Sequence, residues 1–309
     1  MDSWPAVNPS YLAIQDDVLF AALECGDFYG EYGGGAAAYR INPDGSLLLL
    51  SEKATHGKNP CHVCPRPDGK KLYVSNYTDG SLSIFDVTNG LLGDVSVIKH
   101  TGHGPNDRRQ EGPHVHSAIA EPGNKRIGVT DLGIDQVIFY NTDDMRPAGF
   151  LETKAGSGPR HIVFSGNARF VWAVCELSSE VYAFESGSCK VIGVYKTLPD
   201  QYTGPNTCAA IKLAPDEKRL YVSNRGHDSI ACFAIDGNTG ELSLCGNFPA
   251  YGQNPRDFEI SPDGSFLFAA NQDSDNITVF RINDGVLVNT GLSLKIPAPV
   301  CIINYTKPE

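Results

Sequence analysis

Short apolar runs separated by turn residues cover the chain from end to end. Runs at 72–76, 220–224 and 267–271 each follow a turn built from Pro, Asp, Gly, Glu or Lys, and a run of alternating polar and apolar residues comes next, as at 81–85. Runs of β-branched and aromatic residues bounded by such turns are typical of antiparallel hairpins. No stretch of useful length has helical periodicity. The pattern therefore predicts an all-β protein.

These hairpins recur with a common signature, in which Asn or Gly precedes Pro and an apolar run follows. The occurrences are Asn8-Pro9, Asn59-Pro60, Gly112-Pro113, Gly158-Pro159, Gly204-Pro205, Asn254-Pro255 and the variant Ala298-Pro299. Successive prolines lie 44 to 53 residues apart, which matches the length of one propeller blade. We therefore predict a seven-bladed β-propeller of four-stranded antiparallel blades.

Counting the repeats shows one incomplete blade. Six units are complete, at about 8–57, 58–111, 112–157, 158–203, 204–253 and 254–297, and only the first strand of a seventh follows at 299–305. Propellers usually close by combining strands from both chain ends in one blade. We therefore expect a single β-propeller domain over 1–309 whose N-terminus is truncated.

The charge balance narrows the range of partners. The chain has 36 acidic and 25 basic side chains, and its formal net charge of −11 repels nucleic acid and anionic membranes. There is no apolar stretch of membrane-spanning length and no secretory signal at Met1-Asp2-Ser3-Trp4-Pro5. Nine scattered cysteines suggest free thiols in a reducing compartment. We expect a cytoplasmic monomer that binds neither nucleic acid nor membrane.

Basic and polar residues gather at one rim of the predicted blades. Because the first two strands of each blade are antiparallel, the start of the first and the end of the second share a rim. Second-strand ends contribute Glu24, Asn76, Asp131, Glu176, Asn224 and Asn271. Arginine binds carboxylate or phosphate through two donors, and histidine transfers protons near neutral pH. The alternative is structural hydrogen bonding between blades. If the rim instead binds an anionic substrate, the candidate substrate-binding residues are His62, His114, His161, His227, Arg256 and Asn271.

Motifs for metals and for other catalytic machinery are weak. The pair Cys61 and Cys64 has no second pair at zinc spacing, and the pair His114 and His116 has no matching carboxylate in the sequence. No G-x-S-x-G nucleophile motif occurs. We expect neither a metal nor a cofactor.

Several strings resemble the lactonase family of seven-bladed propellers, which includes propeller-type 6-phosphogluconolactonases and fungal carboxy-cis,cis-muconate lactonizing enzymes. They are Asn59-Pro60-Cys61-His62, Pro113-His114-Val115-His116-Ser117, Gly158-Pro159-Arg160-His161, Ser223-Asn224-Arg225-Gly226-His227-Asp228-Ser229-Ile230 and Asn271-Gln272-Asp273-Ser274-Asp275. The resemblance runs from about residue 8 to the end of the chain.

The resemblance implies a catalytic set of one His, two Arg and one Glu. By motif these are Arg160, Arg225, Glu176 and a histidine of the Pro-His-x-His string, His116 or alternatively His114. One departure from the family is Cys175, which stands where an Asn often precedes that Glu. The implied reaction is hydrolysis of a sugar-phosphate lactone, most simply 6-phosphogluconolactone. In it the His is the general base, one Arg stabilises the oxyanion and another binds the phosphate. Glu176 holds an Arg or the His in place.

Two alternatives remain at this point. A carboxymuconate cycloisomerase would use the same arginines on carboxylates. A non-catalytic propeller scaffold would present aromatic residues for a protein partner. The chain has only two tryptophans, Trp4 and Trp172, and Trp172 lies in a second-strand run that suggests the core. This favours an enzyme over a scaffold.

Overall fold

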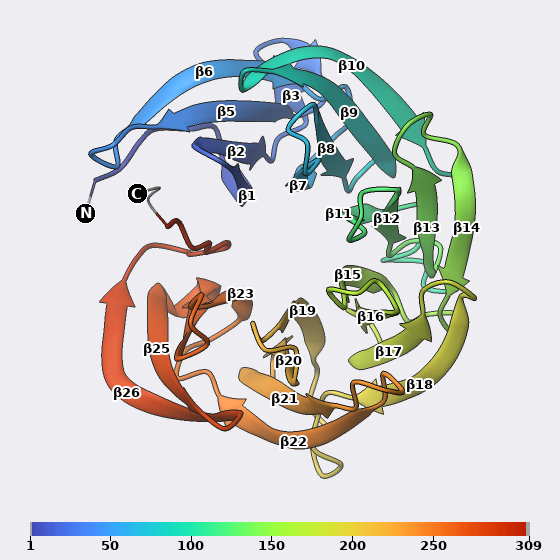
Figure 1. The fold of residues 1–309 in the computed structure, drawn as a ribbon, viewed down its shortest axis with the longest axis vertical. Helices are drawn as coiled ribbons and strands as arrows, with labels where there is room; N and C mark the ends of the chain where they lie inside the picture. The colour runs from blue at the N-terminus through green and yellow to red at the C-terminus, as the bar shows by residue number, and fades with distance from the viewer. Residues whose placement is uncertain (1, 307–309) are drawn as a thin grey trace. The chain divides into compact units, whose positions relative to one another are not determined.

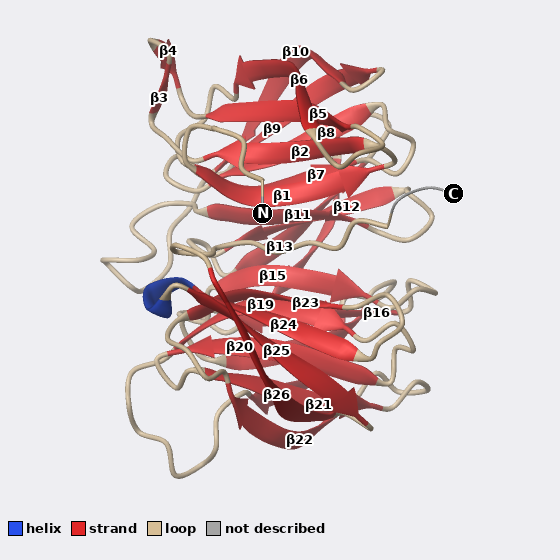
Figure 2. Ribbon diagram, turned by 90° about the vertical axis from the view of Figure 1, so that its left-hand side faces the viewer, coloured by secondary structure: helices blue, strands red, loops and turns tan. Residues whose placement is uncertain are grey.

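The computed structural model describes residues 2–306 and contains six four-stranded antiparallel sheets. Within the described residues the only helix is the short 3-10 turn η1 (Gln272–Ser274), seen beside the strands in Figure 2. The predictions of an all-β fold and of four-stranded antiparallel blades are confirmed. No helix in the described part has the length and apolar character needed to cross a membrane.

The chain divides into two compact units, 1–148 with 305–309 and 149–304, and the boundary falls within β14. We describe each unit by itself, and the single domain over 1–309 stays a prediction.

The first three sheets lie in the N-terminal part of the chain (Figure 1). The first sheet contains β1 (Pro9–Gln15), β2 (Val18–Leu23), β5 (Gly35–Ile41) and β6 (Leu47–Ala54), with a small hairpin of β3 (Asp27–Phe28) and β4 (Glu31–Tyr32) inserted. The second contains β7 (Pro60–Pro65), β8 (Lys71–Asn76), β9 (Ser81–Thr88) and β10 (Leu91–Lys99). The third contains β11 (Val115–Ala120), β12 (Arg126–Asp131), β13 (Gln136–Asn141) and β14 (Pro147–Glu152).

The other three sheets follow in chain order. The fourth contains β15 (Pro159–Phe164), β16 (Phe170–Cys175), β17 (Glu180–Glu185) and β18 (Lys190–Lys196). The fifth contains β19 (Thr207–Leu213), β20 (Arg219–Arg225), β21 (Ser229–Ile235) and β22 (Leu242–Pro249). The sixth contains β23 (Pro255–Ile260), β24 (Phe266–Asn271), β25 (Asn276–Asn283) and β26 (Val286–Lys295).

Within each unit the sheets pack face to face, and their first strands are neighbours. β7 lies between β1 and β11 in one unit, and β19 lies between β15 and β23 in the other. Alternating apolar residues of adjacent sheets form the cores between them, as where Trp172 of β16 packs with residues of β19–β21. Trp172 is buried, and its indole N–H donates to the carbonyl of Gly240 at 3.0 Å. Its predicted place in the core is confirmed.

The strand expected at 299–305 does not form, so this prediction is wrong. A strand needs a row of backbone partners. Here the Ile302 N–H donates to the Asp257 side chain at 3.0 Å, and the Asn304 side chain donates to the Ile260 carbonyl at 2.6 Å. The segment is therefore tied to β23 by side chains rather than by a ladder.

Candidate active site

In four of the six Asn/Gly-Pro signatures the residue before the proline has a left-handed backbone conformation. The residue before the proline has φ of 41° at Asn8, 53° at Asn59, 63° at Gly158 and 58° at Asn254. Gly reaches this region without strain, and Asn tolerates it better than most residues. The backbone conformation explains why these two residue types precede the repeat prolines.

A β-bulge follows directly after this turn. In the fourth sheet Pro159 pairs with Cys175 and His161 with Val174, so Arg160 is the extra residue. The same one-residue slip occurs in the first, second, third and sixth sheets, where the extra residues are Ser10, Cys61, His116 and Arg256. In the fifth sheet the slip falls at 209–210. Bulges re-aim side chains and are frequent beside active sites. Two of the four predicted catalytic residues occupy these positions.

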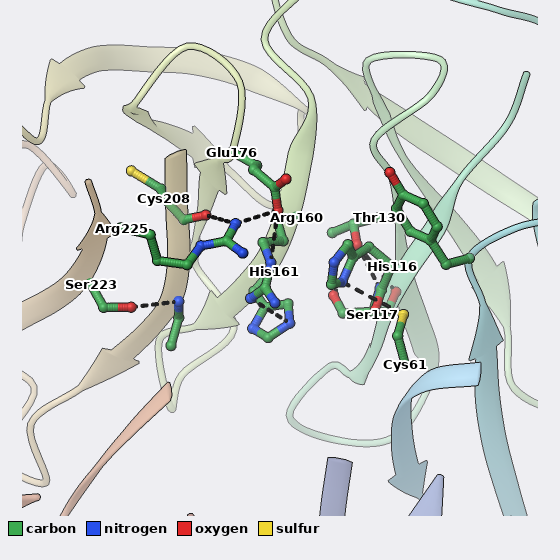
Figure 3. Close-up of polar contacts among 12 residues, drawn as sticks. Cys61, His116, Ser117, Thr130, Arg160, His161, Glu176, Cys208, Ser223 and Arg225 are labelled. Atoms are coloured by element: carbon green, nitrogen blue, oxygen red, sulfur yellow. Dashed lines mark hydrogen bonds and ion pairs between the residues drawn. The ribbon is translucent and has the colours of Figure 1, made fainter. Parts of the chain in front are cut away.

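The structure brings Arg160, Glu176 and Arg225 together (Figure 3). Oε2 of Glu176 lies 3.0 Å from Nε of Arg160 and 2.8 Å from Nη2 of Arg225. Nη2 of Arg225 also donates to the Cys208 carbonyl at 2.9 Å. The Arg160 and Glu176 side chains are only 4% and 5% exposed. One carboxylate therefore orients two arginines that reach it from different sheets.

This cluster keeps a net positive charge in a largely dry place. Two guanidinium groups share one carboxylate, so one positive charge is not neutralised within the trio. Burial strengthens the field of such a charge, because little water screens it. Such an arrangement stabilises an anion or a developing oxyanion.

The loop after β20 explains the Asn-Arg-Gly-His-Asp-Ser string. Gly226 has φ of 111°, and a Cβ there would lie 2.3 Å from the carbonyl oxygen of Pro205. Asp228 Oδ1 accepts the N–H groups of Gly226 at 3.2 Å and of Asn254 at 2.8 Å. The string therefore fixes the backbone next to Arg225 and joins it to the turn that opens the sixth sheet.

His161 lies beside the arginine cluster, as Figure 3 shows. Its Nε2 is 3.2 Å from Nη1 of Arg160. Because arginine only donates, this nitrogen of His161 accepts and is unprotonated. His161 thus helps to hold the Arg160 guanidinium.

A second group of predicted residues lies at the start of β11. Nδ1 of His114 is 2.9 Å from the Tyr77 carbonyl and its Nε2 is 3.3 Å from Glu111, while its ring stacks on Tyr77 at 4.4 Å. Nδ1 of His116 is 3.8 Å from the Cys61 thiol, and its ring meets the edge of Tyr77 at 5.5 Å. Both ring nitrogens of His114 therefore have protein partners, and the choice of His116 as the base stays a prediction from the family motif.

Asp131 binds the backbone of His114 and the side chain of His100. Its Oδ1 accepts the His114 N–H at 2.7 Å, and its Oδ2 lies 2.7 Å from Nδ1 of His100. Nε2 of His100 is 3.0 Å from the Tyr140 hydroxyl, and all three side chains are buried. Sequence reasoning placed Asp131 at the rim but did not identify this supporting role, nor the contacts of Tyr77 and Cys61.

The remaining predicted residues have other contacts. His62 is buried and packs on the Tyr11 ring at 4.3 Å. Nδ1 of His227 is 2.7 Å from the Ser229 hydroxyl. Asn271 is buried, and its amide donates to Thr278 at 3.0 Å. Arg256 is half-buried. Their roles in substrate binding stay predictions.

The sheet register separates Glu176 from four of the five second-strand residues with which the sequence analysis grouped it, whereas Glu24 shares its register. The residue at the register position of Asn76, Asp131, Asn224 and Asn271 is Cys175, and Glu176 comes one place later. Asn76 donates within its sheet to Ser83, and Asn224 donates to Ser229. The asparagines therefore close hairpins, whereas Glu176 pairs with arginines. The departure at Cys175 affects the hairpin-closing position and leaves both Glu176 ion pairs in place.

Comparisons with known proteins identify the family of this chain. Residues 5–304 match the family model described as Lactonase, 7-bladed beta-propeller. The chain is 34% identical over 307 residues to the 6-phosphogluconolactonase of Bacillus subtilis, covering 96% of this chain and 86% of that protein. It is 36% identical over 312 residues to the 6-phosphogluconolactonase of Formosa agariphila, with the same coverage.

Solved structures give the same result. A periplasmic gluconolactonase of Pseudomonas aeruginosa aligns with a TM-score of 0.86 and 31% identity, over 94% of this chain and 86% of that one. A protein from Lactobacillus plantarum aligns with a TM-score of 0.87 and 32% identity, over 95% and 87% of the two chains. These findings give no support to the muconate lactonizing alternative.

Proposed function

Since this chain belongs to the lactonase family of seven-bladed β-propellers, we propose that it hydrolyses 6-phosphogluconolactone to 6-phosphogluconate. The observation that carries the proposal is the buried Arg160–Glu176–Arg225 cluster. Its net positive charge suits a substrate that is an anion and a reaction that forms an oxyanion. The names of two relatives that are at least 34% identical support the substrate.

In the proposed reaction His116 is the general base. A water oxygen attacks the lactone carbonyl carbon while His116 takes a proton from the water. The resulting tetrahedral oxyanion is stabilised by arginine. The ring C–O bond then breaks, and the departing alkoxide takes the proton back from His116 and becomes a hydroxyl group. The products are a free hydroxyl and a carboxylic acid, which then releases its proton to solvent and becomes a carboxylate, and no cofactor enters the balance.

In this scheme Glu176 orients the two arginines and neutralises part of their charge. With both arginines fixed on one carboxylate oxygen, their remaining N–H donors have set directions before substrate arrives. Donors that need no reorganisation stabilise a transition state best, and the loss of one such donor typically lowers kcat about 10²–10³-fold.

The test is a lactone-opening assay with 6-phosphogluconolactone, corrected for spontaneous hydrolysis. It compares the wild type with Arg160→Ala, Arg225→Ala and His116→Asn. The matched control is Arg281→Ala, because Arg281 lies over the Phe266 ring on the outer face of β25. We expect large losses in the first three variants and none in the control. Equal rates in all of them would remove the hydrolase proposal, and binding without turnover would restore the scaffold alternative.

We further propose that the protein acts in the cytoplasm as a monomer and binds no nucleic acid. All nine cysteines are free in the structure, which suits a reducing compartment. The net charge of −11 opposes contact with nucleic acid. Fractionation of the source cells and sedimentation of the purified protein test these points.

A further inference from the structure

Arg256 of the sixth sheet occupies the position that Arg160 occupies in the fourth. Each follows a left-handed residue and a proline, and each is the extra residue of a bulge opposite the end of the second strand. In the fourth sheet the Glu176 N–H donates to the Gly158 carbonyl at 2.7 Å. In the sixth the Gln272 N–H donates to the Asn254 carbonyl at 3.1 Å. Gln272 is therefore the counterpart of Glu176.

The two equivalent positions differ in charge, because Glu176 is a carboxylate and Gln272 is a neutral amide. Glu176 neutralises part of the charge of Arg160, whereas an amide at Gln272 cannot neutralise Arg256. Within residues 2–306 Arg256 has neither an ion pair nor a side-chain hydrogen bond, and Oε1 of Gln272 is buried without a hydrogen-bond partner. A half-buried guanidinium with no counter-charge costs free energy, and so does an unsatisfied buried amide oxygen. The Arg256 guanidinium therefore has N–H donors available for an anion, whereas the Gln272 oxygen is an acceptor and can bind only a donor.

The two arginine positions belong to one connected framework. β19 lies between the two arginine-bearing strands β15 and β23, and the residues at its bulge, Ala209 and Ala210, are both buried. Asp228 accepts the N–H groups of Gly226, next to Arg225, and of Asn254, two residues before Arg256. The loop of the catalytic Arg225 and the turn of Arg256 are thus joined through one carboxylate.

We propose that Arg256 and Gln272 form the phosphate-binding subsite and select phosphorylated lactones over unphosphorylated ones. This rests on the proposed function and deepens it. The trio around Glu176 supplies a single net positive charge, which the oxyanion uses during the reaction. A phosphate monoester carries close to two negative charges at neutral pH and needs a further cation. Arg256 is that cation, and its planar donors fit a phosphate in two places. The Gln272 side-chain amide adds a neutral donor.

The experiment measures kcat and KM on two substrates, 6-phosphogluconolactone and glucono-1,5-lactone, and binding of 6-phosphogluconate by calorimetry. Arg256→Ala removes the cation. Gln272→Glu places a carboxylate where the fourth sheet has one and neutralises Arg256 without truncating it. Arg281→Ala is the control. Thermal unfolding shows that each variant is folded, and Gln272→Glu is nearly isosteric.

For both variants we expect KM for the phosphorylated lactone and the Kd of 6-phosphogluconate to rise about 10- to 100-fold, as for a lost charge-assisted hydrogen bond. Values for glucono-1,5-lactone should change less than about 3-fold, since this substrate lacks the group that Arg256 binds. An equal loss on both lactones, or unchanged 6-phosphogluconate binding in both variants, overturns the subsite.

These results separate the two proposals. If Arg160→Ala abolishes turnover but Arg256→Ala affects both lactones alike, the proposed function stands and the subsite falls. If the wild type opens neither lactone but binds 6-phosphogluconate through Arg256, the hydrolase falls and the anion subsite stands.

Discussion

Replacing Glu176 with Gln is the most direct test of the arginine cluster. The change keeps the shape of the side chain and removes its charge. It leaves Arg160, 4% exposed, and Arg225, 14% exposed, as two neighbouring positive charges without their shared carboxylate. The glutamine amide keeps one oxygen that can accept from the arginines, but that oxygen carries no negative charge.

The size of the effect follows from the distances. At an effective dielectric constant of about 20, contacts of 3.0 and 2.8 Å each correspond to about 5–6 kcal/mol of gross attraction. Most of that offsets the desolvation of the groups. Removing one partner of a buried ion pair typically costs about 3–5 kcal/mol. For units of this size that loss lowers Tm by roughly 10 °C.

Differential scanning fluorimetry and circular dichroism measure this shift, with Glu241→Gln as the control. Glu241 is exposed and accepts only a 3.3 Å hydrogen bond from the Thr239 hydroxyl, so its variant should melt like the wild type. We also expect kcat of Glu176→Gln on 6-phosphogluconolactone to fall at least about 10-fold, because the arginine donors lose their orientation. A Tm within about 2 °C of the wild type, where roughly 10 °C is expected, would refute the reasoning.

Three further predictions follow from the surrounding structure. Gly226→Ala forces a Cβ into a neighbouring carbonyl at a φ of 111°, so kcat should fall with the shift of Arg225 while far-UV circular dichroism stays unchanged. Asp131→Asn breaks the hydrogen-bonded link between His100 and the His114 backbone and should lower the free energy of unfolding by about 1–3 kcal/mol in urea titrations. Burial raises the pKa of the Cys208 and Cys232 thiols from 9.0 to about 12, so only the unfolded chain releases these protons between pH 9 and 12. The free energy of unfolding should therefore fall as pH rises through that window, and Cys208→Ala should flatten the slope; an unchanged slope would contradict this assignment.

The sequence predicted the sheets and the arginine cluster well, because both depend on local patterns. Turn residues and alternation mark hairpins, and the strings around Arg160 and Arg225 are specific to a family. The bulges were not predicted, since a one-residue slip in pairing leaves no signature in a single strand. This is why Glu176 was grouped with the hairpin-closing asparagines, one register position away.

Other errors came from contacts distant in sequence. The segment 299–305 has the apolar pattern of a strand but forms none in the described part of the chain, so the pattern alone gave a wrong prediction. The stacking of Tyr77 on His114 joins residues of two sheets, and no spacing rule reveals it. The missing counter-charge of Arg256 became visible only when the register matched Gln272 with Glu176.

The turn–proline–bulge unit has a consequence for how such proteins diversify. The side chain at the bulge does not belong to the regular alternation of its strand, so its identity is free to change while the flanking strands keep their pairing. In this chain the bulge position holds Ser10, Cys61, Arg160 and Arg256 directly after a proline, and His116 after Val115. New ligand preferences are therefore accessible through single substitutions at five sites, at little cost in folding.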